Sequence, residues 1–239
     1  MTELVLDRTE IGGAVVVRPT GLLDLSTYRE LRDGLLRCAA NGPTAVIVRL
    51  DDGFECATPA FMSVFTTVWT RVSKWPGIPV MLVGESPEHR EALATGASKL
   101  PRFSVLDAAL AAVGEPPERR RDEIQLPESP VSSMLAREFV RKACERWHVD
   151  NLTPSAETVA TELVENAVRH SQSEPVLRME LSGGRLTIAV RDESSDPPEA
   201  REPSRSGGRG LTIVSALSET WGSSPWPRGG KVVWAVIND

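Results

Sequence analysis

The residues best suited to chemistry lie in one short stretch, Thr161 to His170, which reads TELVENAVRH. It follows Thr153-Pro154, an N-cap residue and then the helical position that favours proline. Apolar residues from Ala156 to Val168 recur at helical spacing, which predicts a helix with one buried face. On the other face, Glu162 and Asn166 lie one turn apart and project side by side. A carboxylate at such a place can orient or deprotonate a hydroxyl or a water, and an amide oxygen is a hard ligand of the kind Mg²⁺ prefers.

An ordinary solvated amphipathic helix is the alternative interpretation of this polar face, because Glu and Arg there stand at helical pairing distance. Asparagine, however, is a poor helix former away from helix ends. The position of Asn166, in the middle of the helix and one turn from Glu162, therefore calls for an explanation from the rest of the chain.

Two further pieces follow downstream. Asp192 ends an apolar strand, and the polar segment from Asp192 to Gly210 closes with Gly207-Gly208-Arg209-Gly210-Leu211 at a helix start. Glycines allow close approach of the backbone to phosphates, and a helix start offers free N–H groups and a positive dipole. Arg209 would add a charged contact to phosphate. Taken singly, these are a strand-end turn and a flexible glycine loop, although so long a loop is usually functional.

Together and in this order, Glu162-x-x-x-Asn166, Asp192 and Gly208-Arg209-Gly210-Leu211 resemble the ATPase domain of the GHKL superfamily, shared by gyrase, histidine kinases and anti-sigma-factor kinases. The resemblance extends over about Ile124 to Asp239. It implies ATP and Mg²⁺ as cofactors, with Asn166 as the Mg²⁺ ligand and Glu162 as the catalytic carboxylate. Asp192 would accept a hydrogen bond from the exocyclic amine of adenine. Gly208, Arg209, Gly210 and Leu211 would complete the nucleotide-binding set.

The stretch from Glu162 to His170, with the glycines that open the next helix, most closely resembles the anti-sigma-factor serine kinase branch. Two positions depart from the superfamily pattern. No glycine follows Asp192, where Asp-x-Gly-x-Gly is usual, and Val232 stands where a family strand commonly carries Thr, so a hydroxyl contact is lost. A non-catalytic, nucleotide-responsive interaction module with a degenerate STAS domain is therefore the alternative to an active Ser/Thr kinase.

The first half of the chain alternates strands with helices, which predicts an α/β layer arrangement. Expected strands are Leu4–Leu6, Ala14–Arg18, Thr44–Leu50 and Ile78–Val83, with a turn at Pro19-Thr20-Gly21. Expected helices begin after Asp24 or Ser26, at Thr58-Pro59, at Ser86-Pro87 and at Asp107. The stretch Gly21 to Ser26 and the strand–loop–helix from Leu50 to Phe65 resemble the STAS fold of anti-sigma-factor antagonists, a mixed sheet with helices.

Thr58 is the candidate phosphoacceptor, by the same resemblance. In STAS antagonists the acceptor hydroxyl starts the helix after the third strand, within an Asp-Ser-Ser-Gly type of sequence; here the matching residues are Ala57-Thr58-Pro59-Ala60. A helix N-terminus would stabilise an added phosphate. Thr58-Pro59 equally predicts a plain N-cap and first helical residue, so both interpretations stay open.

Gly114 to Pro130 changes composition abruptly, with several prolines and the arginine run Arg119 to Arg121. It predicts a linker between a STAS-like domain at 1–113 and an ATPase domain at 131–239. The arginine run is interpreted as solvated linker, with a basic contact patch as the alternative. Ile124 and Leu126 are candidates for a short added strand. The second domain should be a two-layer α+β sandwich, with helices at Ser132–Trp147, around Glu162 and at Leu211–Leu217, a hairpin turn at Ser182–Arg185 and strands at Trp221–Trp226 and Val232–Ile237.

The length, net charge and composition of the chain limit the classes of function that we expect. The chain has 239 residues and a net charge of −6, which argues against a nucleic-acid-binding surface as its main business. We find no apolar window long enough for a membrane span, no secretory signal, and three scattered cysteines that suggest a reducing cytoplasm. With the resemblances, the expectation is a cytoplasmic, ATP-binding, partner-switching regulator of transcription. It would phosphorylate a STAS-type antagonist and/or sequester a sigma factor; a homodimer is among the expected assemblies, and direct nucleic-acid or membrane partners are not.

Overall fold

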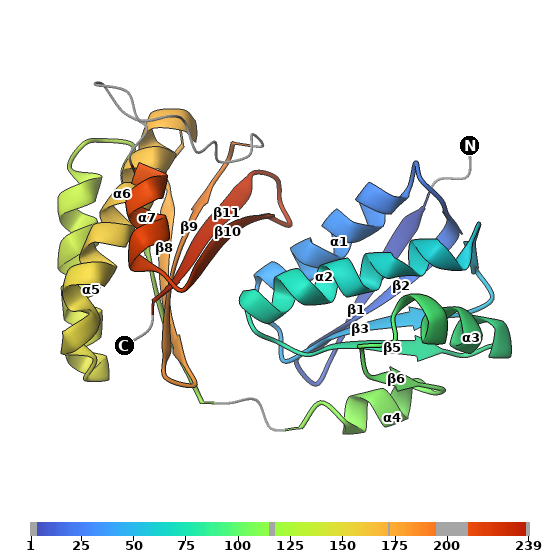
Figure 1. Ribbon diagram of the computed structural model, residues 1–239. Coiled ribbons are helices and arrows are strands. Elements are labelled where there is room, and N and C mark those ends of the chain that lie inside the picture. The colour runs from blue at the N-terminus through green and yellow to red at the C-terminus, as the bar shows by residue number, and fades with distance from the viewer. Residues whose placement is uncertain (1–3, 115–117, 172, 195–209, 238–239) are drawn as a thin grey trace. The chain divides into compact units, whose positions relative to one another are not determined.

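The structure is a computed structural model that describes residues 4–114, 118–171, 173–194 and 210–237. The chain divides into two compact units, Met1–Pro116 and Pro117–Asp239 (Figure 1). Each unit has its own sheet and its own hydrophobic core. No helix in the described ranges is long and apolar enough to cross a membrane.

The first unit is a mixed sheet with the strand order β1-β2-β3-β5-β6. Its main strands are β1 (Val5–Ile11), β2 (Ala14–Leu23), β3 (Val46–Leu50), β5 (Val80–Gly84) and β6 (Arg102–Phe103), and β4 (Phe54–Cys56) pairs with the end of β2. Only β1 and β2 pair antiparallel among these; the other pairings are parallel. The helices are α1 (Tyr28–Ala40), α2 (Ser63–Lys74), α3 (Pro87–Gly96) and α4 (Leu106–Ala111). A mixed sheet with helices is the α/β class predicted for the N-terminal half, and that class is confirmed.

Alternation along the central strands of this sheet builds two cores. Val46, Val48 and Leu82 point to the face covered by α1 and α2, whereas Ile47 and Met81 point to the face covered by α4 (Figure 1). Parallel strands buried on both faces read as continuous apolar runs, which is why β3 and β5 were recognisable in the sequence.

The predicted turn at Pro19-Thr20-Gly21 is wrong, because these residues lie inside β2. Pro19 pairs with Leu6 of β1. On its other side β2 pairs with β3 only at Val15–Val17 and with β4 only at Gly21–Leu23. Pro19 lies between these two pairings, where its missing N–H leaves no ladder bond unmade, so the strand continues through it.

The second unit is an antiparallel sheet with the order β10-β11-β9-β8-β7, covered on one face by three helices (Figure 1). The strands are β7 (Arg119–Gln125), β8 (Val176–Ser182), β9 (Arg185–Asp192), β10 (Thr220–Pro225) and β11 (Lys231–Ile237). The helices are α5 (Ser132–Trp147), α6 (Thr153–Ser171) and α7 (Gly210–Leu217). The predicted two-layer α+β class is confirmed.

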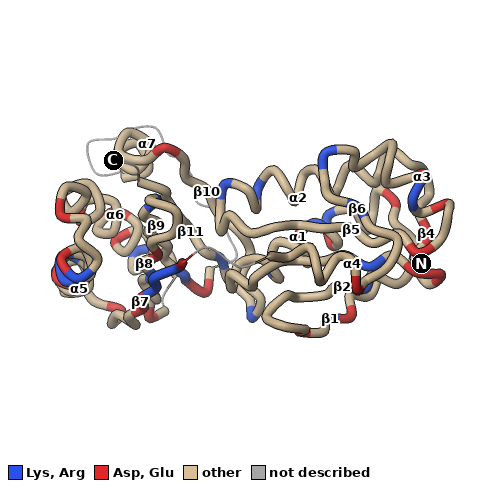
Figure 2. The backbone as a smooth tube through the Cα atoms, turned by 90° about the horizontal axis from the view of Figure 1, so that it is seen from below, with Lys and Arg blue, Asp and Glu red and all other residues tan. Residues whose placement is uncertain are grey.

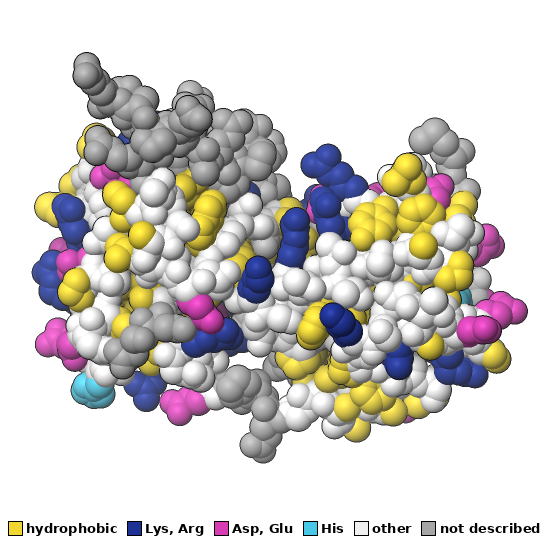
Figure 3. Space-filling model, in the orientation of Figure 1, with side chains coloured by type: hydrophobic (Ala, Val, Ile, Leu, Met, Phe, Trp, Pro, Cys, Tyr) yellow, Lys and Arg dark blue, Asp and Glu magenta, His cyan; other side chains and the backbone are white. Residues whose placement is uncertain are grey.

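Gly114 to Pro130 is not linker throughout, because the arginine run begins strand β7. Arg119 Nε lies 3.1 Å from Glu180 Oε1 of β8, and Arg146 of α5 pairs with Asp122. Figure 2 shows basic and acidic positions together at β7 and β8. Opposite charges on the neighbouring strand and helix stabilise β7, although its charged composition suggests a solvated linker. Figure 3 likewise shows Lys and Arg scattered among hydrophobic and acidic side chains on the face in view.

Alternation also sorts the second sheet into two faces. Leu177, Ile188, Val190, Val233 and Ala235 point to the helices and belong to the core cluster that includes residues of α5, α6 and α7. Residues of the same phase at the strand ends must point the same way. This places Asp192, the last residue of β9, and Lys231, the first of β11, on the helix-covered face.

One helix boundary differs from expectation. A 3₁₀ turn at Asp150–Leu152 leads directly into α6, so Thr153 has helical angles (φ −54°, ψ −46°) and is not an N-cap in extended conformation. Pro154 remains near the helix start, where its lack of an N–H costs no intrahelical bond.

Candidate functional site

Helix α6 positions Glu162 and Asn166. Its buried face, with Val159, Leu163 and Ala167, fixes the rotation of the helix on the sheet. Glu162 and Asn166 are both half-buried, and neither side chain hydrogen-bonds another described residue. An acid and an amide one turn apart are therefore available to a ligand.

The start of helix α7 lies against Glu162. A Cβ built on Gly210 would stand 2.6 Å from Glu162 Oε2, closer than real contacts allow. Leu211 and Val214 hold α7 in the core shared with α6. Gly210 thus permits the first turn of α7 to approach the carboxylate, where the turn's free N–H groups and positive dipole favour anions. The structure brings Glu162 and Gly210 together.

The environment of Glu162 raises the pKa of its carboxyl group. Burial is the main cause, repulsion from Glu165 adds to it, and Arg169 opposes it. Glu165 itself accepts a 3.2 Å hydrogen bond from the Ser133 hydroxyl of α5. A carboxylate with a raised pKa is a stronger base, which suits a group that must take a proton from a hydroxyl.

Asp192 is buried at the end of β9 and is already engaged. Its Oδ1 lies 3.0 Å from Lys231 Nζ and accepts a 2.8 Å hydrogen bond from the Ser194 N–H. Burial raises the pKa of Asp192. The hydrogen bond and charge of Lys231, the hydrogen bond from the Ser194 N–H and the charge of His170 oppose this shift. Removing one partner of such a pair would leave an uncompensated buried charge.

The end of α6 is tied to the end of β9. Ser171 and Ser173 hydroxyls lie 2.9 Å apart, and Ser173 Oγ accepts a 3.3 Å hydrogen bond from the Glu193 N–H. His170, one turn beyond Asn166, is close enough to act electrostatically on Asp192. Asn166 and Asp192 therefore lie at the same end of the helix–sheet layer.

Lys231 is the site residue that the sequence analysis did not single out. Its backbone pairs with Asp192 across β9 and β11, and its side chain points to the same face. Counting back in steps of two from the core residues Ile237, Ala235 and Val233 would have placed it inward. The sequence predicts a lost hydroxyl contact at Val232, and the same alternation of side chains along β11 corrects that expectation. Val232 points to the face of the sheet opposite the helices, beside Arg191, so a threonine there would not stand on the face of Asp192.

The remaining predicted nucleotide-binding residues divide into two groups. Gly208 and Arg209 lie outside the described residues. Gly210 and Leu211 form the first turn of α7, and the Leu211 side chain is buried in the core, so that only its backbone is available to a ligand.

Thr58 lies in the other unit, in the loop between β4 and a 3₁₀ turn at Pro59–Met62. Its side chain is exposed and makes no capping hydrogen bond, whereas its carbonyl accepts from the Cys56 thiol at 3.0 Å. The N-cap interpretation of its hydroxyl is therefore not realised. Ser86, by contrast, caps α3 by accepting from the His89 N–H at 3.1 Å.

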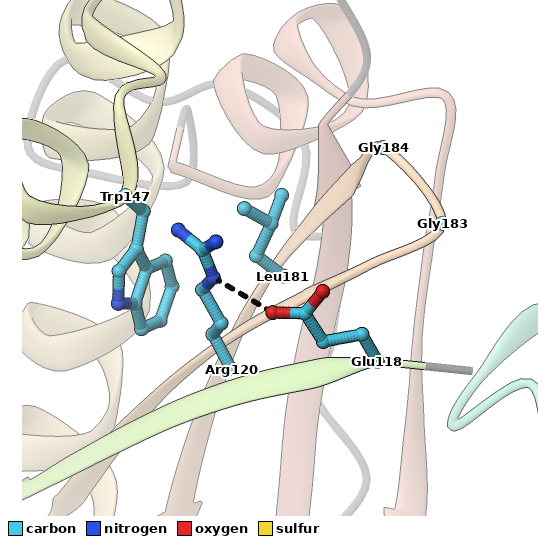
Figure 4. A pocket seen from close by; sticks show the side chains of 6 residues that line it. All are labelled: Glu118, Arg120, Trp147, Leu181, Gly183 and Gly184. Atoms are coloured by element: carbon cyan, nitrogen blue, oxygen red, sulfur yellow. Dashed lines mark ion pairs between the residues drawn. The ribbon is translucent and has the colours of Figure 1, made fainter. Parts of the chain in front are cut away.

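A separate cavity of about 330 Å³ lies at the hairpin end of the second sheet. Figure 4 shows Arg120 reaching between Trp147 and Leu181, with its ion pair to Glu118. The hairpin glycines that also line it stand at the opposite end of β9 from Asp192, about 23 Å away at the usual rise per strand residue. It holds neither of the α6 residues and is not part of the candidate site.

The donor set on α6 fits a magnesium ion that keeps waters and phosphate oxygens as its other ligands. Such an ion needs only one or two protein oxygens, and the Asn166 amide supplies one. No cluster of three or more His, Cys, Asp or Glu that could hold a metal by itself occurs in the described part of the chain.

Comparisons with known proteins place these elements. Residues 126–237 match the family model described as the histidine kinase-like ATPase domain, which implies ATP binding. A search of curated proteins by sequence found no match.

Solved structures similar to the N-terminal half include an anti-sigma factor antagonist from Mycobacterium paratuberculosis, with 21% identity, a TM-score of 0.39, and coverage of 47% of this chain and 96% of that one. A variant of RsbS from Moorella thermoacetica has 15% identity, a TM-score of 0.37, and coverage of 45% and 93%. The antagonist SpoIIAA in its unphosphorylated form has 14% identity, a TM-score of 0.36, and coverage of 46% and 96%.

The domain match covers every described element from α5 to β11, and with them Glu162, Asn166, Asp192 and Gly210. Residues 126–237 thus match a histidine kinase-like ATPase domain, and the unit that precedes them in the chain is a mixed sheet with helices.

Proposed function

We propose that this protein is a partner-switching regulator of transcription whose second unit binds Mg·ATP and phosphorylates a Ser or Thr of a STAS-type antagonist. The observation that carries the proposal is the placement of Glu162 and Asn166. They lie one turn apart on α6, without polar partners among the described residues, and the start of α7 touches the carboxylate through Gly210. These features lie within a domain of the ATPase family.

In this proposal Asn166 binds the magnesium ion and Asp192 selects the base. The ion, when bound, neutralises charge on the phosphates. Asn166 contributes an uncharged oxygen and so leaves room for phosphate oxygens as ligands. Asp192 accepts from the exocyclic amine of adenine through Oδ2, because Oδ1 is taken by Lys231 and Ser194. The first turn of α7, with Gly208 and Arg209 before it, holds the phosphates.

Glu162 acts as the general base. Its carboxylate takes the proton of the attacking hydroxyl, whose oxygen forms the new bond to the γ-phosphorus while the bond to the ADP oxygen breaks. The bonding electrons leave with ADP. Burial and Glu165 raise the pKa of Glu162, which increases its basicity for this step.

The partner is a STAS-type antagonist, a sigma factor, or both in turn, and a homodimer is compatible with the proposal. We place the protein in the cytoplasm, with no direct nucleic-acid or membrane contact. The boundary between the two domains, predicted within residues 114–130, then lies before β7, between Pro116 and Pro117. The chain's own STAS-like unit then serves as an internal pseudo-substrate, a dimerisation module or a target for a second kinase. Thr58 is the candidate phosphoacceptor, because its hydroxyl is exposed and free of capping bonds.

A second candidate is a non-catalytic module in which nucleotide binding alters partner affinity without phosphate transfer. It is favoured by the Asp192–Lys231 pair, which occupies part of the acceptor that adenine would need. It is also favoured by Ser194 and Asp196, which stand where the pattern Asp-x-Gly-x-Gly has its glycines, and by Ala57 before Thr58.

Isothermal titration calorimetry, paired with a radiolabel transfer assay, tests the proposal. Titrations of the full chain with ATP and ADP, with and without Mg²⁺, should give Mg-dependent ATP binding. Incubation with [γ-³²P]ATP and a STAS antagonist should then label the antagonist. Binding without label supports the non-catalytic module, and absence of binding contradicts both candidates.

A further inference from the structure

Lys231 lies in the proposed nucleotide site, beside the carboxylate of Asp192. It opens β11 directly opposite Asp192, the last residue of β9, and both side chains point to the helix-covered face of the sheet. Any base that reaches the Asp192 carboxylate must also lie close to the Lys231 ammonium, because the two groups are 3.0 Å apart.

The hydrogen bonds of the pair leave one acceptor and one donor unused. Oδ1 of Asp192 accepts from Lys231 Nζ and from the Ser194 N–H. Lys231 Nζ also donates to the Ser194 carbonyl at 3.4 Å. An ammonium has three N–H groups and a carboxylate has two oxygens. Among the described residues, the third N–H of Lys231 and Oδ2 of Asp192 therefore remain without partners, side by side.

Burial makes this arrangement selective. The side chains of Lys231 and Asp192 are only 9% and 3% exposed, so water competes little for the unused positions. Burial raises the pKa of Asp192, and the hydrogen bond and charge of Lys231 oppose that shift and so favour the ionised carboxylate. A site with buried polar groups strongly rejects any ligand that leaves them unpaired.

The two classes of purine differ at the edge that such a pair would contact. Adenine offers a donor at its 6-amine and an acceptor at N1; 6-oxopurines such as guanine and hypoxanthine offer an acceptor at O6 and a donor at N1. A carboxylate alone attracts the 6-amine and repels O6. Where an acceptor lies beside a donor, adenine can pair its 6-amine with the acceptor and its N1 with the donor. A 6-oxopurine can pair its O6 with the donor and its N1–H with the acceptor.

We propose that Lys231 is a specificity-determining residue which, with Asp192, allows the site to take 6-oxopurine nucleotides as well as ATP. In the oxo case Lys231 donates to O6 and Asp192 accepts from the N1–H. This inference rests on the proposed nucleotide site and deepens it. It names the purine class that the site admits.

Calorimetry with ATP and ITP on the full chain tests the inference, since the two ligands differ only at the purine N1 and C6 positions. We expect the dissociation constant of ITP to lie within about tenfold of that of ATP. In Lys231→Met, ITP should weaken by roughly 30-fold or more relative to ATP, because O6 then faces the carboxylate alone. Lys142→Met, an exposed lysine on α5, is the matched control and should leave the ratio unchanged.

The outcomes separate the two proposals. ATP binding with ITP weaker by about a thousandfold in the wild-type protein overturns the role of Lys231 and leaves the ATP site standing. An equal change for both nucleotides in Lys231→Met overturns it as well. Binding of neither nucleotide to the wild-type protein overturns the nucleotide site and the inference together. If circular dichroism shows that Lys231→Met does not fold, the wild-type ratio decides.

Discussion

Gly210 and Glu162 are in such close contact that a Cβ on Gly210 would lie 2.6 Å from Oε2 of the glutamate. The contact joins the first turn of α7 to the middle of α6, two elements separated in sequence by two strands. A helix start that touches an acid with no hydrogen-bonded partner among the described residues is an arrangement that a bound phosphate and a reacting hydroxyl can use.

Gly210→Ala should displace the Glu162 carboxylate while costing little stability. The clashing atom is the end of a flexible side chain, so the fold can adjust within about 0.5 kcal/mol. We expect phosphate transfer to fall by roughly tenfold or more, because catalytic geometry tolerates small displacements poorly. Transfer kinetics and urea unfolding measure the two effects. In Glu162→Ala the same glycine substitution should have no further effect on transfer; additive losses would count against the contact.

Glu162→Gln should retain ATP binding and lose transfer. It should also alter the pH dependence of stability, because the folded state raises the pKa of Glu162. A carboxyl group with a raised pKa binds its proton more tightly in the folded protein. Its contribution to stability is therefore fully present below the pKa of the unfolded state and is lost as the pH rises through the pKa of the folded state. At neutral pH the variant should therefore melt slightly higher, by about 1–3 °C, and at acid pH the two proteins should converge. A lower melting temperature of the variant at pH 7 would contradict the conclusion that burial raises the pKa of Glu162.

Lys231→Met should be strongly destabilising on its own. It leaves the Asp192 charge buried without its partner, which costs about 3–5 kcal/mol. The double variant Asp192→Asn/Lys231→Met removes both charges and should recover most of that loss. Denaturant unfolding of the two single variants and the double variant gives the coupling energy. Simple additivity would mean that the two side chains do not interact in solution.

Thr58→Ala should leave stability unchanged within about 0.5 kcal/mol, because the hydroxyl makes no capping bond. Ser86→Ala in the same unit is the matched control; it removes a real N-cap and should cost about 1 kcal/mol. Mass spectrometry after incubation with Mg·ATP then asks whether Thr58 carries phosphate. An unmodified Thr58 peptide after complete transfer to a separate antagonist would remove it as an acceptor.

Sequence patterns predicted the elements that carry strong local signals. Helix α5 was expected at Ser132–Trp147 and is found there, and the hairpin at Gly183-Gly184 has the two positive φ angles that its glycines suggest. The α6 pair and the strand-end Asp192 could be located because apolar periodicity fixes which side chains share a face.

What the sequence could not supply depends on pairing between distant segments. Pro19 looks like a turn residue until the gap between the β3 and β4 pairings is known. Arg119 and its neighbours look like a solvated linker until Glu180 lies beside them. Lys231 acquires meaning only from register with Asp192, since no local pattern identifies a cross-strand partner 39 residues away.

The most direct measurement of the central claim is calorimetric titration of the full chain with ATP in the presence and absence of Mg²⁺, for the wild-type protein and Asn166→Ala. The account predicts Mg-dependent binding by the wild-type protein and its loss, by about a hundredfold or more, in Asn166→Ala, with an unchanged circular dichroism spectrum. Equal Mg-dependent affinity in the two proteins would contradict it.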